Sequence, residues 1–284
     1  MTKIIPINEK EKGYPKILKE IPDYPKMLFC RGNTDLLSKK HLVSIVGSRK
    51  ATEYGLRQTR KIAYDLSGSG VVIVSGLALG IDSEAHKGAL DAGGKTVAVL
   101  GSAIDNFYPA ANEALAERML KTGNLIISEY PEGSPTYRSN FPLRNRIIAG
   151  MSKATIVCEA ARRSGALITA FLALDYNREV YALPGNIDRY NSKGTNYLIK
   201  KGAGCITSSD DILEGLGLLK KKQEEIKLDE NETKVAEIIQ KGYVNFDEII
   251  EKSGIDASRL NIILATMELK GVLSRLSSGE YAIG

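Results

Sequence analysis

The stretch that decides the fold runs from Val43 to His86 and reads VSIVGSRKATEYGLRQTRKIAYDLSGSGVVIVSGLALGIDSEAH. Two apolar runs rich in β-branched residues, Val43–Val46 and Val71–Val74, each end in a turn of small residues, and a helical pattern follows each turn. A strand, a glycine-rich turn and a helix therefore occur twice in succession. Such turns leave backbone N–H groups free at a helix N-terminus, and this geometry receives phosphate groups.

The alternation of short strands and helices continues from Lys40 to Leu219. Most of the strands lack polar alternation, which is typical of strands buried on both faces of a parallel sheet. We therefore predict an α/β fold, an extended Rossmann-like, doubly wound parallel sheet. The expected strands are Val43–Val46, Val71–Val74, Thr96–Leu100, Leu125–Ser128, Ala154–Val157 and Val180–Leu183. The expected helices are Tyr54–Leu66, Asp82–Ala92, Asn112–Leu120, Arg144–Met151, Ala166–Tyr176 and Asn196–Lys201.

The remaining segments complete a four-part organisation. Residues 1–39 form a short N-terminal extension with helical patches at Pro15–Ile21 and Tyr24–Leu28, and residues 40–219 form the Rossmann-like domain. Residues 220–231 are a charged linker without apolar periodicity. Residues 232–284 carry three helical patterns and a terminal hairpin, which together predict a small winged-helix domain.

Composition indicates a soluble globular protein. Of the 284 residues 43% are hydrophobic and 26% are charged. No apolar run approaches the roughly 18 residues needed to span a bilayer, and the N-terminus has no apolar signal segment. The three cysteines, Cys30, Cys158 and Cys205, are far apart and show no metal-ligand spacing. We expect a cytoplasmic protein with reduced thiols and no membrane association.

The positive charge is unevenly placed. Residues 229–284 hold six Lys or Arg and ten Asp or Glu, a net charge of −4, and the chain as a whole carries +5, which leaves +9 on residues 1–228. An anionic polymer should therefore bind the larger N-terminal part. In the winged-helix unit, the third helix offers only Arg259 and Lys270 as cations. We expect a protein-contact or auxiliary role for this unit rather than strong duplex binding.

The first turn, Gly47-Ser48-Arg49, suits phosphate, because a guanidinium adds a planar fork of donors. It does not match the dinucleotide fingerprint GxGxxG, whose third residue would be Arg49 instead of glycine. The acidic ribose ligand expected about 20 residues further on is also missing, since the next strand ends in Val74-Ser75-Gly76. These departures weaken an interpretation as a nicotinamide oxidoreductase, and we expect no cofactor.

The second turn leads into a helix that carries Asp82 and His86. Gly76 and Gly80 permit close backbone approach, and Asp82 is placed to cap the helix. For His86, four residues after Asp82, we favour a hydrogen-bonded core histidine over a functional one. Two histidines and no clustered carboxylates leave little material for a metal site or a His-based triad, so we expect no catalytic residues.

A third signal lies in Tyr137–Arg146, where three arginines, two asparagines and two aromatic residues precede a helix. Cations that hold phosphates and an aromatic ring that stacks a base are typical of single-strand binding, although an exposed basic loop is the simpler alternative. Further small-residue turns follow the fifth and sixth strands, at Arg162-Arg163-Ser164-Gly165 with Thr169, and at Pro184-Gly185-Asn186. Together they predict one anion-binding edge of the sheet.

These same segments carry a family resemblance. The motifs are VGSR, VVIVSGLALGIDSEAH, GGKTVAVLG, SEYPEG, FPLRNRIIAG, SGALIT, LPG and SKGTN. In them the chain resembles the DNA-processing protein A family, also called DprA or Smf, whose members are bacterial transformation factors. The resemblance implies a homodimer that binds single-stranded DNA, protects incoming strands in natural transformation and recombination, and promotes loading of RecA. It implies no catalysis.

The resemblance also implies site residues. The family's phosphate pocket falls on Gly47, Ser48, Arg49, Ser75, Gly76, Asn145, Arg146, Ser164, Gly165 and Thr169, and its basic and base-stacking positions fall on Arg138 and Phe141. One departure is that Ala110-Ala111 follow Tyr108-Pro109 where many members have a basic residue. The alternative function is a Rossmann-type nucleotide-processing enzyme resembling a nucleoside-monophosphate phosphoribohydrolase. Such an enzyme would need an acid beside the sugar, and the SGALIT turn contains none.

Overall fold

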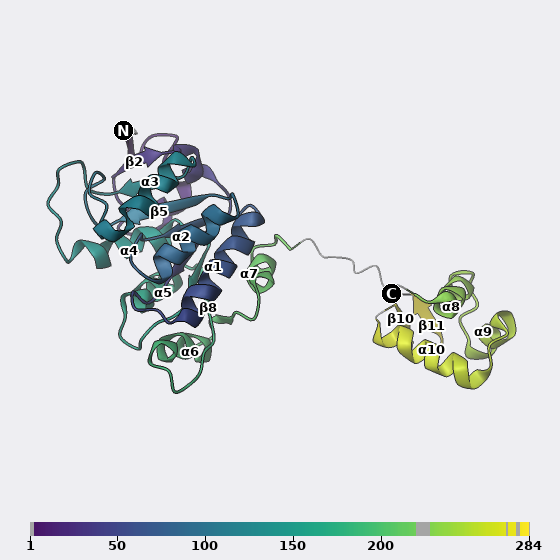
Figure 1. The fold of residues 1–284 in the computed structure, drawn as a ribbon. Coiled ribbons are helices and arrows are strands. Elements are labelled where there is room, and N and C mark those ends of the chain that lie inside the picture. Colours follow the sequence, from purple (N-terminus) through teal and green to yellow (C-terminus); the bar gives the residue numbers. More distant parts are fainter. Residues whose placement is uncertain (1–2, 220–227, 271, 277–278, 284) are drawn as a thin grey trace. The chain divides into compact units, whose positions relative to one another are not determined.

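The computed structural model describes residues 3–219, 228–270, 272–276 and 279–283 (Figure 1). The chain divides into two compact units, Met1–Leu219 and Lys220–Gly284. Residues 220–227 of the expected linker and Ser277-Ser278 of the expected hairpin turn lie outside the described residues. Across the described ranges, no helix combines the length and the apolar character that crossing a membrane requires.

The larger unit is built on a nine-stranded sheet with the order β1-β2-β6-β5-β4-β3-β7-β8-β9. Strands β3 to β9 run parallel to one another, while β2 is antiparallel to both β1 and β6. The strands are β1 (Ile4–Asn8), β2 (Met27–Gly32), β3 (Leu42–Val46), β4 (Val72–Ser75), β5 (Thr96–Leu100), β6 (Leu125–Ser128), β7 (Ala154–Val157), β8 (Glu179–Ala182) and β9 (Gly204–Cys205).

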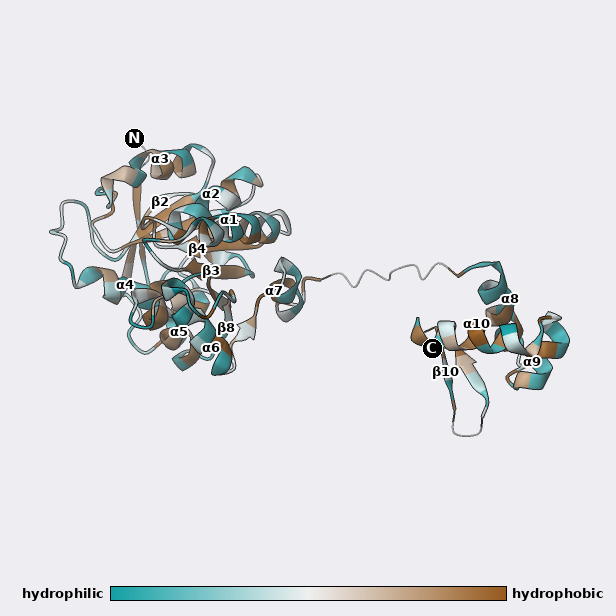
Figure 2. Ribbon diagram, turned by 60° about the horizontal axis from the view of Figure 1, so that its bottom comes forward, coloured by the Kyte–Doolittle hydropathy of each residue, from teal (hydrophilic) through white to brown (hydrophobic). Residues whose placement is uncertain are grey.

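Two layers of helices cover the sheet. The helices of this unit are α1 (Glu53–Gly68), α2 (Ile81–Asp91), α3 (Glu113–Lys121), α4 (Asn140–Gly150), α5 (Gly165–Asp175), α6 (Lys193–Lys200) and α7 (Ser209–Gly215). Its short 3₁₀ helices are η1 (Lys16–Glu20), η2 (Thr34–Ser38), η3 (Ala110–Asn112) and η4 (Tyr190–Ser192). Apolar side chains of α1, α2, α3 and α7 pack on one face, and those of α4, α5 and α6 pack on the other. Figure 2 shows hydrophobic residues concentrated on the strands between these layers. The predicted doubly wound α/β fold is confirmed.

The order of the strands creates a switch point beside β3. From β3 the chain moves outward through β4, β5 and β6, and then returns to place β7 on the other side of β3. The connections that leave the carboxyl ends of β3 and β7 therefore diverge to opposite faces of the sheet. Open α/β sheets bind ligands at this kind of crevice.

The N-terminal segment differs from the expectation. The helical patch expected at Tyr24–Leu28 is wrong, because Met27–Gly32 forms strand β2 and pairs with β6. The alternation of its buried residues, Leu28 and Cys30, has the period of two that a strand requires. Residues 4–32 thus extend the parallel sheet by an antiparallel edge. The short strand β9 and helix α7 were also not expected.

The smaller unit consists of α8 (Glu230–Gln240), α9 (Phe246–Ser253), α10 (Ala257–Leu269) and the antiparallel strands β10 (Leu273–Arg275) and β11 (Tyr281–Ile283). Its core joins residues of all three helices to both strands in one cluster, which includes Val235, Ile249, Leu264 and Tyr281. Helix α9 ends at Gly254, whose φ of 67° is the left-handed conformation that glycine adopts readily. Three helices and a hairpin are the predicted winged-helix pattern.

Candidate nucleic-acid interface

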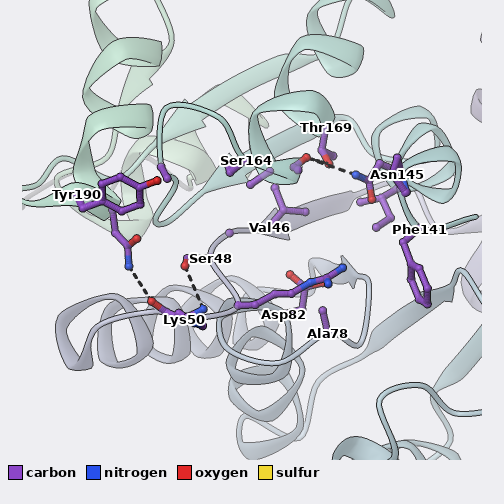
Figure 3. A pocket seen from close by; sticks show the side chains of 18 of the residues that line it. Val46, Ser48, Lys50, Ala78, Asp82, Phe141, Asn145, Ser164, Thr169 and Tyr190 are labelled. Carbon is purple, nitrogen blue, oxygen red and sulfur yellow. Dashed lines mark hydrogen bonds between the residues drawn. The ribbon is translucent and has the colours of Figure 1, made fainter. Parts of the chain in front are cut away.

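A pocket of about 880 Å³ opens at the switch point of the sheet (Figure 3). It is lined by the turn after β3, the N-terminal parts of α4 and α5, and the loop that contains η4. The turn after β3, the N-terminus of α5 after β7 and the η4 loop after β8 leave the same edge of the sheet, because these strands are parallel neighbours. The pocket therefore brings together the small-residue turns that the sequence placed after β3 and β7.

The turn after β3 is fixed by its contacts with α2 and with the end of β7. A Cβ atom on Gly47 would lie 2.5 Å from the Ile81 side chain, so only glycine lets the turn approach α2 this closely. The Ser48 amide donates to the Glu159 carbonyl at 2.8 Å, and the Ser48 hydroxyl accepts from the Lys50 amide at 3.1 Å. This fixed turn presents the exposed side chains of Arg49 and Lys50, which form no ion pair within the described residues.

Glu159 joins two loops of the pocket from a buried position. Its carboxylate accepts hydrogen bonds from the Thr52 amide at 2.8 Å and from the Thr52 hydroxyl at 2.5 Å. It also accepts from the Asn191 side-chain amide at 3.2 Å. Both carboxylate oxygens are therefore occupied, and the N-terminus of α1 is tied to the η4 loop.

The N-terminus of α5 faces the pocket with Ser164, Gly165 and Thr169. Ser164 is the N-cap, but its side chain caps no amide, and its buried hydroxyl oxygen has no hydrogen-bond partner among the residues that the structure describes. The Gly165 carbonyl accepts from the Thr169 hydroxyl at 3.3 Å and from the Asn145 amide at 3.4 Å. The first amides of a helix lack intrahelical acceptors and carry a partial positive charge, so this end attracts an anion.

The turn after β4 is packed into the protein. Gly76 accepts a hydrogen bond of 2.7 Å from the Arg144 guanidinium, and its amide donates to Asp82 at 3.1 Å. Arg144 also donates to the Val99 carbonyl. The expectation of free backbone amides at both turns is therefore wrong for Gly76 and Ser48, whose N–H groups bind protein acceptors. The expectation that Asp82 caps its own helix is also wrong, since α2 has no side-chain cap.

Burial shapes the electrostatics of the pocket floor. It raises the pKa of the Asp82 carboxyl, and Arg144 with the amides of Ala78 and Gly76 opposes this shift. Burial also lowers the pKa of Arg144 to about 10, against the attraction of Asp82. Arg144 therefore remains charged at neutral pH and places a positive charge beneath the pocket.

Phe141 supplies the aromatic surface at one end of the pocket. Its ring lies 5.2 Å from the Tyr108 ring, centroid to centroid, and the Arg49 guanidinium lies 5.9 Å from its centroid. A Cβ atom on Gly101 would lie 2.8 Å from the Phe141 ring, so glycine makes room for it. The ring is half-buried, with one partner that is aromatic and one that is cationic.

Two predicted arginines lie apart from the pocket lining. Arg138 is exposed on the loop before α4. Arg146 donates to both carboxylate oxygens of Glu129, at 2.7 and 2.8 Å, and lies 3.2 Å from Asp23, with only 12% of its side chain exposed. Successive helical residues point about 100° apart, so Asn145 faces the pocket while Arg146 turns to another flank of α4.

The predicted residues thus divide into three groups. Those that line the pocket are Gly47, Ser48, Arg49, Phe141, Asn145, Ser164, Gly165 and Thr169. Gly76 lines a smaller adjacent hollow together with Arg49, Phe141 and Tyr108. Ser75, Arg138 and Arg146 line neither; the Ser75 hydroxyl instead donates to the Ile45 carbonyl at 2.6 Å inside the sheet.

Sequence reasoning also missed pocket residues. Among them are Lys50, Thr52, Asp82, Arg189, Tyr190 and Asn191. Arg189 and Tyr190, a cation next to an aromatic ring, follow the turn at Pro184-Gly185-Asn186. The combination of cations and aromatic rings that indicates strand binding at Tyr137–Arg146 therefore also occurs here and could have predicted them. Arg144 was predicted as one of the exposed cations of Tyr137–Arg146, but it is buried and donates to the Gly76 and Val99 carbonyls, contacts with distant backbone that the local sequence does not reveal.

His86 lies in the core rather than in the pocket. It is fully buried, and its Nδ1 atom is 2.7 Å from the Thr96 hydroxyl oxygen. Burial and the nearby Arg144 lower the pKa of His86 to about 3, so the imidazole is neutral in the folded protein. The interpretation as a core histidine is confirmed.

The fold and the pocket define a class: a Rossmann-like protein with an anion-binding pocket at its switch point and an appended winged helix. The chain belongs to the DNA recombination-mediator protein A family, whose model matches residues 5–217. The model of the DprA winged helix domain matches residues 220–279. The resemblance that the sequence indicated is confirmed.

Several relatives support this assignment. Protein Smf of Synechocystis is 47% identical over 212 residues, which cover 74% of this chain and 53% of the relative. The DNA processing protein DprA of Streptococcus pneumoniae is 46% identical over 200 residues, which cover 70% of each chain. The chain therefore spans about half the length of the first relative and 70% of the second.

Two solved structures share the fold. The X-ray structure of DprA from Streptococcus pneumoniae matches with a TM-score of 0.70 at 43% identity, covering 75% of this chain and 74% of that one. A structure of DNA processing protein A from Helicobacter pylori, which concerns that protein's single-stranded DNA binding mode, matches with a TM-score of 0.68 at 31% identity. It covers 76% of this chain and 98% of the other.

Proposed function

We propose that this chain binds single-stranded DNA in the switch-point pocket. The observation that carries the proposal is the meeting, in one pocket, of the exposed Arg49, the uncapped N-terminus of α5 and the half-buried ring of Phe141. Cations and helix amides bind phosphates, and an aromatic ring stacks a base. The single-stranded DNA binding described for the Helicobacter pylori relative supports this assignment.

We propose further that the protein binds DNA without catalysis. Asp82 lines the pocket and Glu159 bonds to the lining residues Thr52 and Asn191, and both carboxylates bind protein groups. A phosphoribohydrolase would need a carboxylate free to act beside a sugar. Turnover of AMP or CMP by the purified protein would overturn this part of the proposal.

The cellular role that we propose is that of a cytoplasmic homodimer which protects incoming strands in natural transformation and recombination, and loads RecA on them. Membership of the family and the DNA-processing names of the relatives support this role. It is tested by the lag in RecA filament assembly on oligothymidine, which the protein should shorten, and by light scattering, which should give twice the mass of one chain. An unchanged lag would contradict RecA loading, and the mass of a single chain would contradict the homodimer.

The direct test of binding is a titration with oligothymidine and with a duplex of the same length at two salt concentrations. We expect tighter binding of the single strand, with an affinity that falls steeply with salt because phosphates release counterions when they are neutralised. Equal binding of duplex and single strand, or binding insensitive to salt, would contradict the proposal.

A further inference from the structure

Tyr190 lies at the other end of the pocket from Phe141 (Figure 3). Its side chain is the first of η4, and 70% of the residue is exposed. Within the described residues, neither its ring nor its hydroxyl has a hydrogen-bond, ring or cation partner. A large ring thus stands unpartnered on the wall of a pocket that already holds one aromatic surface.

The loop beneath Tyr190 is rigidly held. The Asn191 side-chain amide donates to the Lys50 carbonyl at 2.8 Å and to the Glu159 carboxylate at 3.2 Å, and the Asn191 carbonyl accepts from the Ala160 amide at 2.7 Å. These bonds join the loop to the turn after β3 and to the end of β7. A ring on a fixed support loses little further freedom when a ligand stacks on it.

Positive charge accompanies the ring. Arg189 and Lys50 line the same part of the pocket, both are exposed, and neither forms an ion pair in the described part of the chain. With Arg49 near Phe141, unpaired cations therefore lie beside both aromatic rings. Alternation of cations and aromatic rings along a groove is the arrangement that binds a nucleic acid strand without regard to its sequence.

We propose that Tyr190 is a second base-stacking platform, so that one single strand crosses the pocket with one base on Phe141 and another on Tyr190. The phosphates between them lie at Arg49, the N-terminus of α5, and Lys50 with Arg189. This inference rests on the proposed function and extends it from a single stacking position to a path. A mononucleotide could use only one of the two rings.

The chain has no tryptophan, so the variant Tyr190→Trp carries a single indole at this position. We expect saturating oligothymidine to quench its emission, because a stacked base contacts the indole face. An abasic sugar–phosphate oligomer of the same length should leave the emission unchanged. The control is Tyr64→Trp, at a tyrosine of α1 that is 50% exposed and lies outside the pocket lining, and whose emission should not respond.

Affinities of two further variants complete the test. Tyr190→Ala should weaken binding of oligothymidine about 5- to 150-fold, the range for loss of one stacked base, and leave binding of the abasic oligomer unchanged. Tyr190→Phe should bind oligothymidine as the wild type does, since it keeps the ring.

The outcomes separate the two proposals. If the wild type binds oligothymidine while Tyr190→Ala binds it equally well and Tyr190→Trp shows no quenching, the second platform is refuted and the proposed function stands. If Tyr190→Ala weakens both oligomers equally, stacking is refuted. If the wild type binds no oligothymidine, the proposed function fails and this inference fails with it.

Discussion

The Arg144 guanidinium donates a hydrogen bond of 2.7 Å to the backbone carbonyl of Gly76, 68 residues earlier in the chain. The same group donates to Val99, and it is buried where α4 meets the ends of β4 and β5. Since α4 also carries Phe141 and Asn145, this contact sets the position of the aromatic end of the pocket relative to the sheet.

Gly76→Ala should therefore destabilise the protein. A Cβ atom at this position would lie 2.5 Å from both terminal nitrogens of Arg144, which is buried and is held there by its hydrogen bonds to the Gly76 and Val99 carbonyls. Overpacking of this kind costs about 1–3 kcal/mol of unfolding free energy. Urea denaturation measures it. The control Gly68→Ala, on the exposed end of α1 with no atom within 4 Å, should be at least as stable as the wild type. Equal stability of the two variants would contradict this account of Gly76.

Arg49→Ala should weaken binding of single-stranded DNA at every sequence. Loss of a charged contact costs about 1.5–3 kcal/mol, and the slope of log affinity against log salt should fall in magnitude by about 0.7 for one phosphate. Fluorescence anisotropy at several salt concentrations measures both quantities. If Arg49→Ala bound single-stranded DNA as tightly as the wild type, Arg49 would not be part of the interface.

Arg146→Ala should behave in the opposite way. Its guanidinium already binds Glu129 and Asp23, so DNA affinity and salt slope should stay at wild-type values. The unfolding free energy should fall by about 1–2 kcal/mol, because the Glu129 carboxylate loses two charge-assisted hydrogen bonds. If Arg146→Ala lost DNA affinity but kept the unfolding free energy of the wild type, Arg146 would be a phosphate-binding residue, contrary to this account.

The free energy of unfolding should fall as the pH is lowered, because the buried His86 resists protonation in the folded state. Its pKa is about 3 in the folded state and about 6.5 in the unfolded chain, so below pH 6.5 only the unfolded state takes up the proton. Folding therefore loses about 2 kcal/mol from this residue between pH 6.5 and pH 5. His86→Gln keeps a group that can bond Thr96 but does not titrate, so its stability should depend less on pH over this interval. The measurement is urea denaturation of both proteins at a series of pH values, and parallel curves would contradict it.

The sequence predicted the fold well where local pattern and burial agree. The buried strands β3 to β7 are short apolar runs rich in Val, Ile and Leu, so their apolar character alone locates them. Strand β2 was not predicted because Pro22 and Pro25 precede it, and because its period of two rests on only two buried residues, Leu28 and Cys30. Strand β9 is two residues long, too short for any period to be visible.

The site was predicted in part, for a related reason. Gly47, Ser48 and Arg49 follow directly from a strand end, so their place is fixed by topology. Within α4, by contrast, Asn145 and Arg146 differ only by one helical step, and the sequence does not say which faces the pocket. That phase is set by long-range contacts, such as the pairing of Arg146 with Glu129.

The winged-helix unit should contribute little to DNA affinity. All pocket residues lie within Met1–Leu219, which forms a compact unit with its own core. Residues 229–284 carry a net charge of −4. Of the two cations expected on the third helix, Lys270 pairs with the buried Glu232 at 2.6 Å, which leaves Arg259. The fragment 1–219 should thus bind oligothymidine within a few-fold of the full chain, since the phosphate contacts that supply affinity are retained.

Residues 229–284 alone should bind duplex DNA weakly even at low salt. On α10, Ile262 and Leu269 are 66% and 91% exposed, and apolar side chains on this helix suit a protein partner better than a phosphate backbone. Gel shifts of this fragment on duplex, beside anisotropy of the fragment 1–219 on oligothymidine, measure the two contributions. The variant Arg49→Ala within 1–219 is the control, since it should lose affinity as it does in the full chain. Tight duplex binding by residues 229–284 would contradict this expectation. So acidic a unit could bind duplex DNA tightly only through specific contacts that overcome its charge, and the winged helix would then be a duplex-binding domain.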